Sequence, residues 1–432
     1  EDIVKRVADI GGTLLPTTQV QKVTLIDQCH ALINNTGEAT NLARSKQIFE
    51  KYADLDEKEK VDFLRQIQND FGVEKKGFNK ALDNWQKSPS EENYRDLHFA
   101  SEPRSQELLR RLNSAPNGTK KLVNLRQDLI QLSNNKDEFY ALEKDFKHLF
   151  SSWFNRGFLE LERIEWTTSA EILEKVIKYE AVHEIQGWGD LRSRVAAQDR
   201  RLYAFFHPSL DNDPLIFVEV ALMTQAPVEV GPILFPEEQL SVDDMSLANT
   251  AIFYSISNCQ IGLRGISFGN FLIKQVVEEL RREQPQLTRF VTMSPVPGLR
   301  KWATQNAKLS IKQKQLVESL NQLETMPDAT FREANDTLLM SIVIEYLLYA
   351  KHRNGGPLNS VSRFHLGNGA RLERINLWAD PSDKGMSNSW GVMVHYEYHL
   401  DYIEINHEAF VSQGKICISP WIKRLTKLSQ EK

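Results

Sequence analysis

The stretch "LRGISFGNFLIKQVVEELRRE", residues 263–283, places two glycines directly before a strongly amphipathic segment. Leu272, Val276 and Leu280 recur at helical spacing, which predicts a helix after the second glycine. The residues before it, "TAIFYSISNCQIG" at 250–262, are rich in β-branched and aromatic side chains and predict a strand. A strand, a glycine turn and a helix in this order indicate a mixed α/β region.

The two glycines, Gly265 and Gly269, leave two interpretations open. Glycine lets the backbone adopt positive φ or approach a ligand closely, and the first amides of the following helix have no intrahelical partner. Such a turn suits a phosphate-like anion, although most turns of this kind only redirect the chain. The spacing is neither G-x-G-x-x-G nor a P-loop, which disfavours dinucleotide and ATP sites. It is loosely similar to the coenzyme A pyrophosphate loop of the GCN5-related N-acetyltransferase (GNAT) fold.

Length and composition describe an ordinary globular protein. At 432 residues the chain exceeds the usual size of one domain, so two domains are expected. A net charge of -5 gives no overall reason to expect a nucleic-acid or membrane partner. The three cysteines, Cys29, Cys259 and Cys417, are too scattered for a disulfide framework or a zinc site. They indicate a reducing compartment, and we expect the cytoplasm.

The chain has two parts that differ in their sequence pattern. Residues 1–155 carry apolar side chains at helical spacing, as in "KKLVNLRQDLIQLSNN" at 120–135, and predict an all-helical bundle. Residues 156–432 alternate short aromatic and β-branched runs with amphipathic stretches, which predicts a mixed sheet with helices. We therefore predict an α+β chain of two domains, and expect the helical one to act as a scaffold and to mediate homo-oligomer formation.

Several long blocks of the second domain resemble the malonyl-CoA decarboxylase family. They are "EAVHEIQGW" at 180–188, "TAIFYSISNCQIGLRGISFGNFLIKQVVEELRREQPQL" at 250–287, "SPVPGLRKW" at 294–302, "AKHRNGGPLNSVSRFHLGNGA" at 350–370, and "INLWAD" with "GVMVHYEY" at 375–380 and 391–398. The resemblance implies a GNAT-like catalytic domain in which two central strands, 251–257 and 289–294, splay apart around coenzyme A.

The resemblance also implies a function for the glycine turn. It implies that the pyrophosphate of the substrate binds to the loop made of Arg264, Gly265, Ile266, Ser267, Phe268, Gly269 and Asn270. Some members of the family carry an acidic residue where this chain has Ser267. Any role of that acidic residue is therefore not expected in this chain.

Two residues far apart in the chain are the predicted catalytic pair. Ser294 precedes "PVPG", where a serine is usually an ordinary turn residue, and a single histidine such as His365 is usually a core residue. The resemblance places both at the family's active site, as a dyad that handles protons; which of them protonates the substrate stays open. Tyr398 matches a family tyrosine near the site, with a core aromatic as the alternative.

The implied reaction converts malonyl-CoA to acetyl-CoA and carbon dioxide. The thioester delocalises the charge left by decarboxylation, so we expect no metal and no organic cofactor. His395, His399 and His407 lie close in sequence, but their acidic neighbours favour a solvated face over a metal site.

Four further polar residues received weaker predictions. We expect His183 to make a structural hydrogen bond. Lys274, Arg300 and Lys301 are candidates for the adenosine phosphate, although surface charge is the simpler interpretation of each.

Two other functions fit a coenzyme A fold. An N-acetyltransferase would pass an acetyl group to an amine and would leave malonyl-CoA intact in the absence of an acceptor. A non-catalytic coenzyme A sensor would keep its ligand affinity without Ser294 and His365, and would have no turnover to lose.

Overall fold

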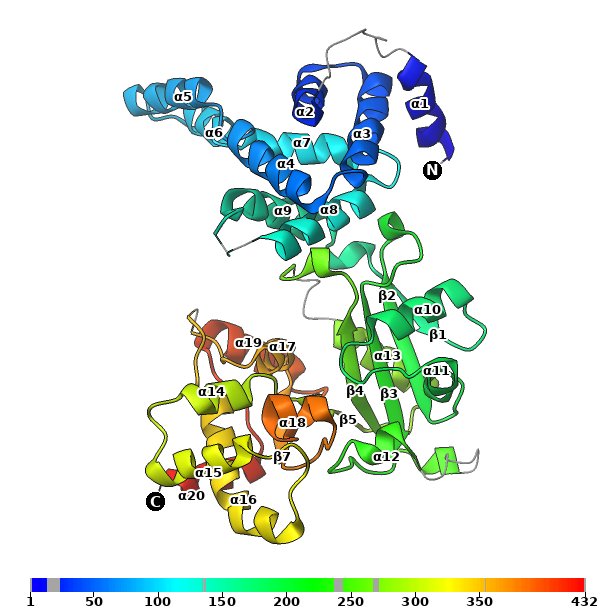
Figure 1. Cartoon of the computed structure of the whole chain (residues 1–432), viewed down its shortest axis with the longest axis vertical. Coiled ribbons are helices and arrows are strands. Elements are labelled where there is room, and N and C mark those ends of the chain that lie inside the picture. Colours follow the sequence, from blue (N-terminus) through cyan, green and yellow to red (C-terminus); the bar gives the residue numbers. More distant parts are fainter. Residues whose placement is uncertain are drawn as a thin grey trace. The chain divides into compact units, whose positions relative to one another are not determined.

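The computed structural model describes residues 2–13, 24–133, 135, 137–236, 244–266, 272–353 and 355–430. The chain divides into two compact units (Figure 1). Unit 1 comprises residues 1–159, 207–213 and 260–268, and unit 2 comprises residues 160–206, 214–259 and 269–432. Helices account for the regular structure described up to Trp153, and the first strand begins at Glu160. The predicted α+β class, helical first and then a mixed sheet, is confirmed.

Unit 1 is a bundle of helices. They are α1 (Asp2–Thr13), α2 (Leu25–Asn34), α3 (Glu38–Ala53), α4 (Glu57–Asp70), α5 (Lys75–Lys87), α6 (Glu91–Ala100), α7 (Arg104–Asn113), α8 (Gly118–Leu132) and α9 (Tyr140–Trp153). Thr24 and Asp56 begin α2 and α4 with reciprocal capping boxes. The predicted apolar stripe of α8 is buried at Leu122, Leu125 and Leu129, which explains why this segment is helical.

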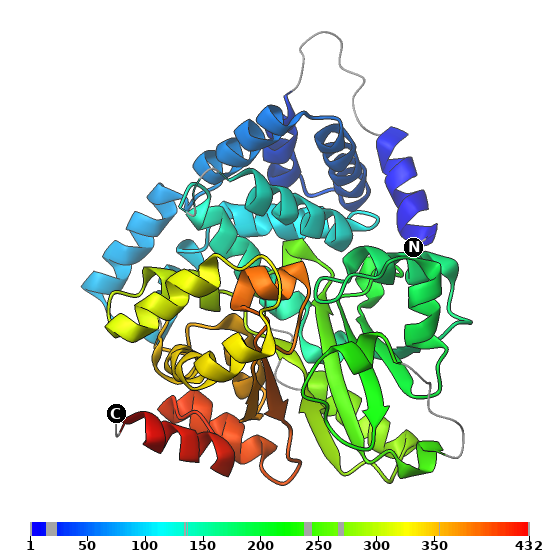
Figure 2. The same cartoon turned by 60° about the horizontal axis from the view of Figure 1, so that its bottom comes forward.

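The hairpin of α5 and α6 extends away from the other helices of unit 1 in both views (Figures 1 and 2). Helix α6 buries none of its residues, although it carries Tyr94, 58% exposed, and Phe99, 71% exposed. Both side chains are therefore largely exposed to solvent and are not packed against the described part of the chain.

Two later segments belong to unit 1, namely the short 3-10 turns η2 (Pro208–Leu210) and η4 (Ile261–Leu263), which pack on α8. A Cβ atom at Gly262 would stand 2.0 Å from the Val123 carbonyl oxygen, so only glycine permits this approach. The fully buried Arg126 guanidinium donates to the carbonyl oxygens of Gly262, at 2.6 Å, and Arg264, at 2.8 Å. Its Nε and Nη2 atoms also donate to the Glu143 carboxylate, each at 2.9 Å.

Unit 2 is built on a mixed sheet. Its strands are β1 (Glu160–Ile164), β2 (Arg200–Phe206), β3 (Ile216–Met223), β4 (Thr250–Asn258), β5 (Arg289–Thr292), β6 (Ser294–Pro295), β7 (Arg371–Asn376) and β8 (Met393–Glu397). The order across the sheet is β1-β2-β3-β4-β5-β8-β6, and β7 also pairs with β8. The pair β4–β5 is parallel and the other pairs are antiparallel.

The longer helices of unit 2 are α10 (Ala170–Tyr179), α11 (Trp188–Val195), α13 (Leu272–Glu283), α15 (Ile311–Asn321), α16 (Ala329–Ile344), α17 (Ser360–Gly367), α19 (Ile403–Gln413) and α20 (Pro420–Gln430). Shorter ones are α12 (Gly231–Leu234), α14 (Leu299–Gln305) and α18 (Asp383–Ser389). Helix α13 follows the glycine turn, as predicted, and buries Leu272, Val276 and Leu280.

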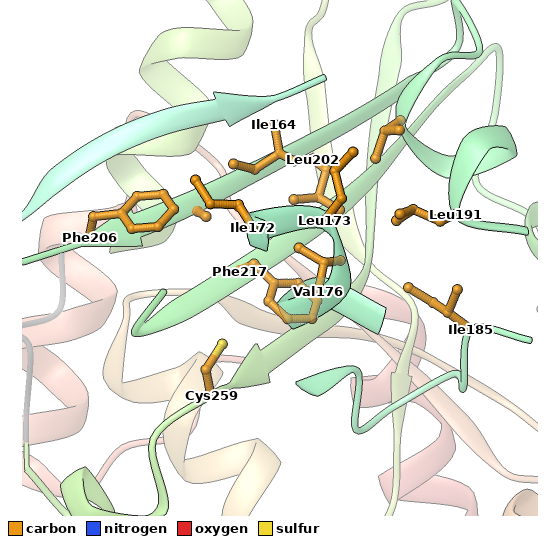
Figure 3. Close-up of a cluster of buried hydrophobic side chains, with 12 residues drawn as sticks. Ile164, Ile172, Leu173, Val176, Ile185, Leu191, Leu202, Phe206, Phe217 and Cys259 are labelled. Carbon is orange, nitrogen blue, oxygen red and sulfur yellow. The ribbon is translucent and has the colours of Figure 1, made fainter. Parts of the chain in front are cut away.

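One part of the unit 2 core lies where α10 and α11 cover the first strands (Figure 3). Val176 of α10, Leu202 of β2 and Phe217 of β3 are each fully buried in this cluster. Removing one such side chain from water stabilises the fold by about 1.5–3 kcal/mol. Burial of these side chains under α10 and α11 therefore anchors the half of the sheet that carries β4.

The sheet divides between β4 and β5. Thr250–Phe253 pair with Arg289–Thr292, and the Met293 amide makes one further bond to the Phe253 carbonyl. Beyond this point β6 pairs with β8, whereas β4 continues to Asn258 paired with β3. A β-bulge in the β3–β4 pairing at Glu219/Val220 increases the local twist at the division. The two central strands that were predicted to splay apart do so at this point.

Candidate active site

Ser294 stands at the division of the sheet, as the first residue of β6. It is 5% exposed, and its hydroxyl donates to Thr292 Oγ1 at 2.8 Å. Its Oγ also lies 3.1 Å from Nε2 of His365, within hydrogen-bond distance. The two residues that the sequence predicted as a dyad are therefore in direct contact.

Helix α17 holds His365 in its last turn. Asn359 caps the start of this helix by accepting from the Ser362 amide at 2.8 Å, and its side-chain amide donates to the Pro297 carbonyl at 3.0 Å. This cap ties the histidine helix to the turn that follows Ser294. The helix ends at a glycine turn, where a Cβ at Gly369 would stand 2.1 Å from the Ile403 carbonyl oxygen of α19.

Two tyrosines surround the imidazole of His365. Tyr396 lies in β8, and Tyr398 directly follows the end of that strand. The Tyr398 hydroxyl lies 2.8 Å from His365 Nδ1, and the Tyr396 ring stacks on the imidazole at 4.7 Å between centroids. Tyr396 is held in turn by a 2.6 Å hydrogen bond between its hydroxyl and Ser362 Oγ. The imidazole is thus fixed in orientation at both nitrogens and on one face.

Thr292 and Tyr396 were not among the predicted site residues. Each is two residues from a predicted site residue, Ser294 and Tyr398 respectively, and residues two apart on a strand share a face. A period-two search around the predicted residues would have found both.

Burial keeps the groups of this site uncharged. It lowers the pKa of His365 from 6.5 to about 3, although the end of a helix favours a cation there by about 0.3–1 kcal/mol. Desolvation outweighs the helix because the ring is almost wholly removed from water. The pKa of Tyr398 is raised well above its ordinary value by the same cause. At neutral pH the free protein therefore holds a neutral imidazole between two hydroxyls.

This arrangement can move a proton along a line of hydrogen bonds. Tyr398, His365 and Ser294 form a continuous chain through the two ring nitrogens. While the Ser294 hydroxyl donates to Thr292, it can only accept from Nε2, so the single proton of the neutral ring lies on Nε2. When the hydroxyl turns to donate to His365 instead, Nε2 accepts and Nδ1 carries the proton toward Tyr398. A hydroxyl backed by an imidazole is suited to general acid–base chemistry on a bound substrate.

The predicted phosphate loop is described in part. Arg264, Gly265 and Ile266 are described, with Gly265 at φ +76°, whereas Ser267, Phe268, Gly269 and Asn270 lie outside the described residues. The amides of Arg264 and Ile266 donate, each at 3.0 Å, to carbonyls of the same turn. Glycine at 265 is explained by its positive φ alone, and these two amides are already paired.

The other histidines make separate contacts. His395 Nε2 lies 3.2 Å from the Met293 sulfur, and His407 Nδ1 lies 2.7 Å from the Gly367 carbonyl oxygen. Across the described part of the chain, no three His, Cys, Asp or Glu side chains are grouped so that they could hold a metal ion.

The remaining predicted polar residues have local partners. The His183 amide donates to Glu180 at 2.7 Å, so its backbone makes the hydrogen bond, while the ring Nε2 has no partner among the described residues. Lys274 forms an ion pair with Glu404 at 2.7 Å. Arg300 binds Asn321 through two nitrogens, each at 2.9 Å, and Lys301 is exposed.

A buried serine–histidine–tyrosine chain at the division of a mixed sheet is the kind of arrangement with which an α+β enzyme can transfer a proton. Residues 157–432 match the family described as the malonyl-CoA decarboxylase C-terminal domain, and residues 71–154 match its N-terminal domain. The chain is also 36% identical over 342 residues to "Malonyl-CoA decarboxylase, mitochondrial" of Anser anser anser, covering 73% of this chain and 68% of that protein. The chain belongs to the malonyl-CoA decarboxylase family, and is a carboxy-lyase.

Solved structures agree with this assignment. Malonyl-CoA decarboxylase from Rhodopseudomonas palustris is 45% identical, with a TM-score of 0.89 over 93% of this chain and 98% of that one. The enzyme from Agrobacterium vitis is 46% identical, with a TM-score of 0.86 over 93% of this chain and 99% of that one. Among the described helices, none has the length and apolar character that crossing a membrane requires.

Proposed function

We propose that this protein decarboxylates malonyl-CoA to acetyl-CoA at Ser294 and His365, without a metal or an organic cofactor. The observation that carries the proposal is the 3.1 Å contact between Ser294 Oγ and His365 Nε2, buried at the division of the sheet. Family membership supplies the substrate, and the contact supplies groups that can orient its carboxylate and handle one proton.

The low pKa of His365 suggests how the proton is used. A malonyl carboxylate beside the ring raises the pKa of the imidazole, because a nearby negative charge favours the protonated form. When carbon dioxide leaves, the electron pair of the broken C–C bond passes into the thioester enolate. The Ser294–His365 pair then supplies the proton that the α-carbon needs, so that malonyl-CoA and one proton give acetyl-CoA and carbon dioxide.

The same proposal gives roles to Tyr398 and to the loop that binds the coenzyme A part of the substrate. Tyr398 holds Nδ1 of His365, so that Nε2 is presented to Ser294. The coenzyme A pyrophosphate binds the loop 264–270, in which the amides of Arg264 and Ile266 are already paired, so Gly265 and residues 267–270 are the ones to supply donors. We also propose that the chain self-associates through unit 1 and works in a reducing compartment, the cytoplasm. The word "mitochondrial" in the names of the relatives describes those proteins.

The test is turnover of malonyl-CoA alone. We expect the purified chain to release carbon dioxide and form acetyl-CoA in equal amounts, and to do so unchanged in a strong chelator. Ser294→Ala and His365→Gln should each lower kcat by about 10²–10⁴-fold, the range for a lost general acid or base. Ser45→Ala, which removes another fully buried hydroxyl, is the matched control.

Other outcomes would identify the alternatives. Loss of activity in chelator would contradict a metal-free reaction. Stable malonyl-CoA, together with acetylation of an amine by acetyl-CoA, would indicate an acetyltransferase. Tight coenzyme A binding without any turnover, and unchanged in both variants, would indicate a sensor.

A further inference from the structure

The turn between α10 and α11, residues 180–184 and here called the Glu180 turn, encloses a buried carboxylate. Glu180 is 9% exposed, and its Oε1 accepts from the amides of Val182 and His183, each at 2.7 Å. The same carboxylate accepts from Ser255 Oγ at 2.8 Å and from Ser257 Oγ at 3.1 Å. One side chain therefore both caps its own turn and holds the turn against β4.

The part of β4 that Glu180 holds lies beyond the division of the sheet. Ser255 and Ser257 follow Phe253, the last residue of β4 that pairs with β5. The Phe253 ring, just before them, packs edge-on against the Tyr398 ring at 6.3 Å. This segment of β4 thus continues directly from a residue that touches the active site, with β3 as its strand partner in the described sheet.

The carbonyl groups of the Glu180 turn are held from the other half of the divided sheet. Lys384 Nζ donates to the carbonyl oxygens of Ala181 and Val182, the latter at 3.3 Å. Lys384 lies in α18, within the connection from β7 to β8, the strand that also pairs with β5 and β6. The turn is therefore bonded to β4 on one side and to the β8 side of the sheet on the other.

A third anchor comes from α11. Arg194 donates to the carbonyls of His183, at 2.9 Å, and Glu184, at 3.2 Å, and pairs with the buried Glu219 of β3 at 3.1 Å. Charge-assisted bonds of this kind are shorter and roughly twice as strong as neutral ones. A turn with this many polar anchors on three elements is far more constrained than a connection between two helices requires.

We propose that the Glu180 turn is a clamp across the division of the sheet, and that Glu180 is a positioning residue for the active site. By holding Ser255 and Ser257, it keeps β4 at the distance from β6 that the acyl end of the substrate needs; this inference rests on the proposed decarboxylation at Ser294. A displacement of about 1 Å at a reacting centre can cost on the order of 10²-fold in rate.

Glu180→Asp separates the two roles of the carboxylate. Aspartate keeps the charge and caps turn amides well, but it is one methylene shorter and cannot also reach Ser255 and Ser257. We expect kcat for malonyl-CoA to fall by about tenfold or more while KM stays within about threefold, because orientation of the acyl end is lost and binding of the rest of coenzyme A is not. Glu184→Asp, at an exposed residue of the same turn, is the matched control.

A second variant and a second readout keep the test independent of turnover. Ser257→Ala removes one β4 donor, and combined with Glu180→Asp it should lower kcat less than the product of the two single effects, because both changes break the same link. Amide hydrogen exchange of residues 254–258 should accelerate in Glu180→Asp and stay unchanged in Glu184→Asp.

The outcomes are distinct. Unchanged exchange in β4, or a kcat equal to that of Glu184→Asp, would overturn the clamp. A rise in KM alone would do the same, because it would indicate a ligand contact instead of positioning. A wild-type protein that leaves malonyl-CoA intact would overturn the proposed function, and the exchange measurement would then still decide whether the clamp exists.

Discussion

At the scale of single residues, the proposed active site depends on keeping a histidine neutral and oriented. His365 is held by Ser294 at one nitrogen and by Tyr398 at the other, and burial outweighs the helix end that would favour its protonation. Oriented groups in a site shielded from water act more strongly on a developing charge than the same groups in solution. Both the orientation and the charge of the His365 ring can be tested by substitution.

Tyr398→Phe removes the hydroxyl at Nδ1 and keeps the ring. One lost hydrogen bond is worth about 0.5–1.5 kcal/mol, so we expect kcat for malonyl-CoA to fall by up to about tenfold. Tyr402→Phe, at a side chain that is 52% exposed, is the matched control. Equal rates in the two variants would mean that Tyr398 is only a core aromatic.

The stability of the protein should depend on His365 in acid. Its pKa is about 3 in the folded protein and 6.5 as the ordinary value, so between these pH values the unfolded chain binds a proton that the folded one does not. Stability is therefore full above pH 6.5 and is lost as the pH falls toward 3, by up to about 1.4 kcal/mol per pH unit from this residue.

His365→Gln removes that dependence. Denaturant unfolding from pH 4 to pH 9 should give a shallower acid slope in the variant, whereas the two curves should run parallel above pH 7. His395, whose pKa burial lowers to about 4, continues to contribute in both proteins. Parallel curves throughout would show that the imidazole is solvated in the folded state.

At the scale of elements, α17 is placed by its two ends. Asn359 ties its start to the turn after Ser294, and Gly369 lets its end approach α19 with φ +82°. Gly369→Ala adds a Cβ that would stand 2.1 Å from the Ile403 carbonyl oxygen, so the helix or its neighbour must move. We expect a loss of about 2 kcal/mol or more in the free energy of unfolding, and a lower kcat because His365 moves with the helix.

Gly414→Ala is the control for this prediction. Gly414 also has positive φ, at +64°, but an added Cβ there would meet nothing within 4 Å. It should cost about 1–2 kcal/mol from backbone strain alone and leave kcat unchanged. If denaturant unfolding and turnover are the same for both variants, the approach of α17 to α19 does not position the histidine.

At the scale of the whole molecule, we expect the exposed hairpin of α5 and α6 to take part in homo-oligomer formation. Large exposed apolar side chains such as Tyr94 and Phe99 favour burial against another copy. We expect Tyr94→Ser combined with Phe99→Ser to lower the oligomer mass measured by light scattering after gel filtration. Ile311→Ser, at a side chain of unit 2 that is 78% exposed, should not. A wild-type chain that is monomeric at all concentrations would refute self-association.

Much of this molecule follows from local sequence. The leucine stripe of α8 and the helix after the glycine turn were predicted because burial imposes a period of 3.6 on helices. The strand β4 was predicted over 250–262 from its β-branched and aromatic residues, and it ends at Asn258, before the turn η4. The family resemblance singled out Ser294 and His365, which no periodicity distinguishes from a turn serine and a core histidine.

Only the tertiary structure brought the distant groups together. Ser294 and His365 are 71 positions apart in the chain, which leaves their distance in space open, and the contact depends on the β5–β8 register and on the position of α17. The clamp at Glu180 depends likewise on β4 and α18, elements far from it in the chain. Gly262 is required where η4 packs on α8, a contact that no local pattern predicted. Local patterns encode which face of an element is buried, whereas the partner that covers it is chosen by packing across the whole fold.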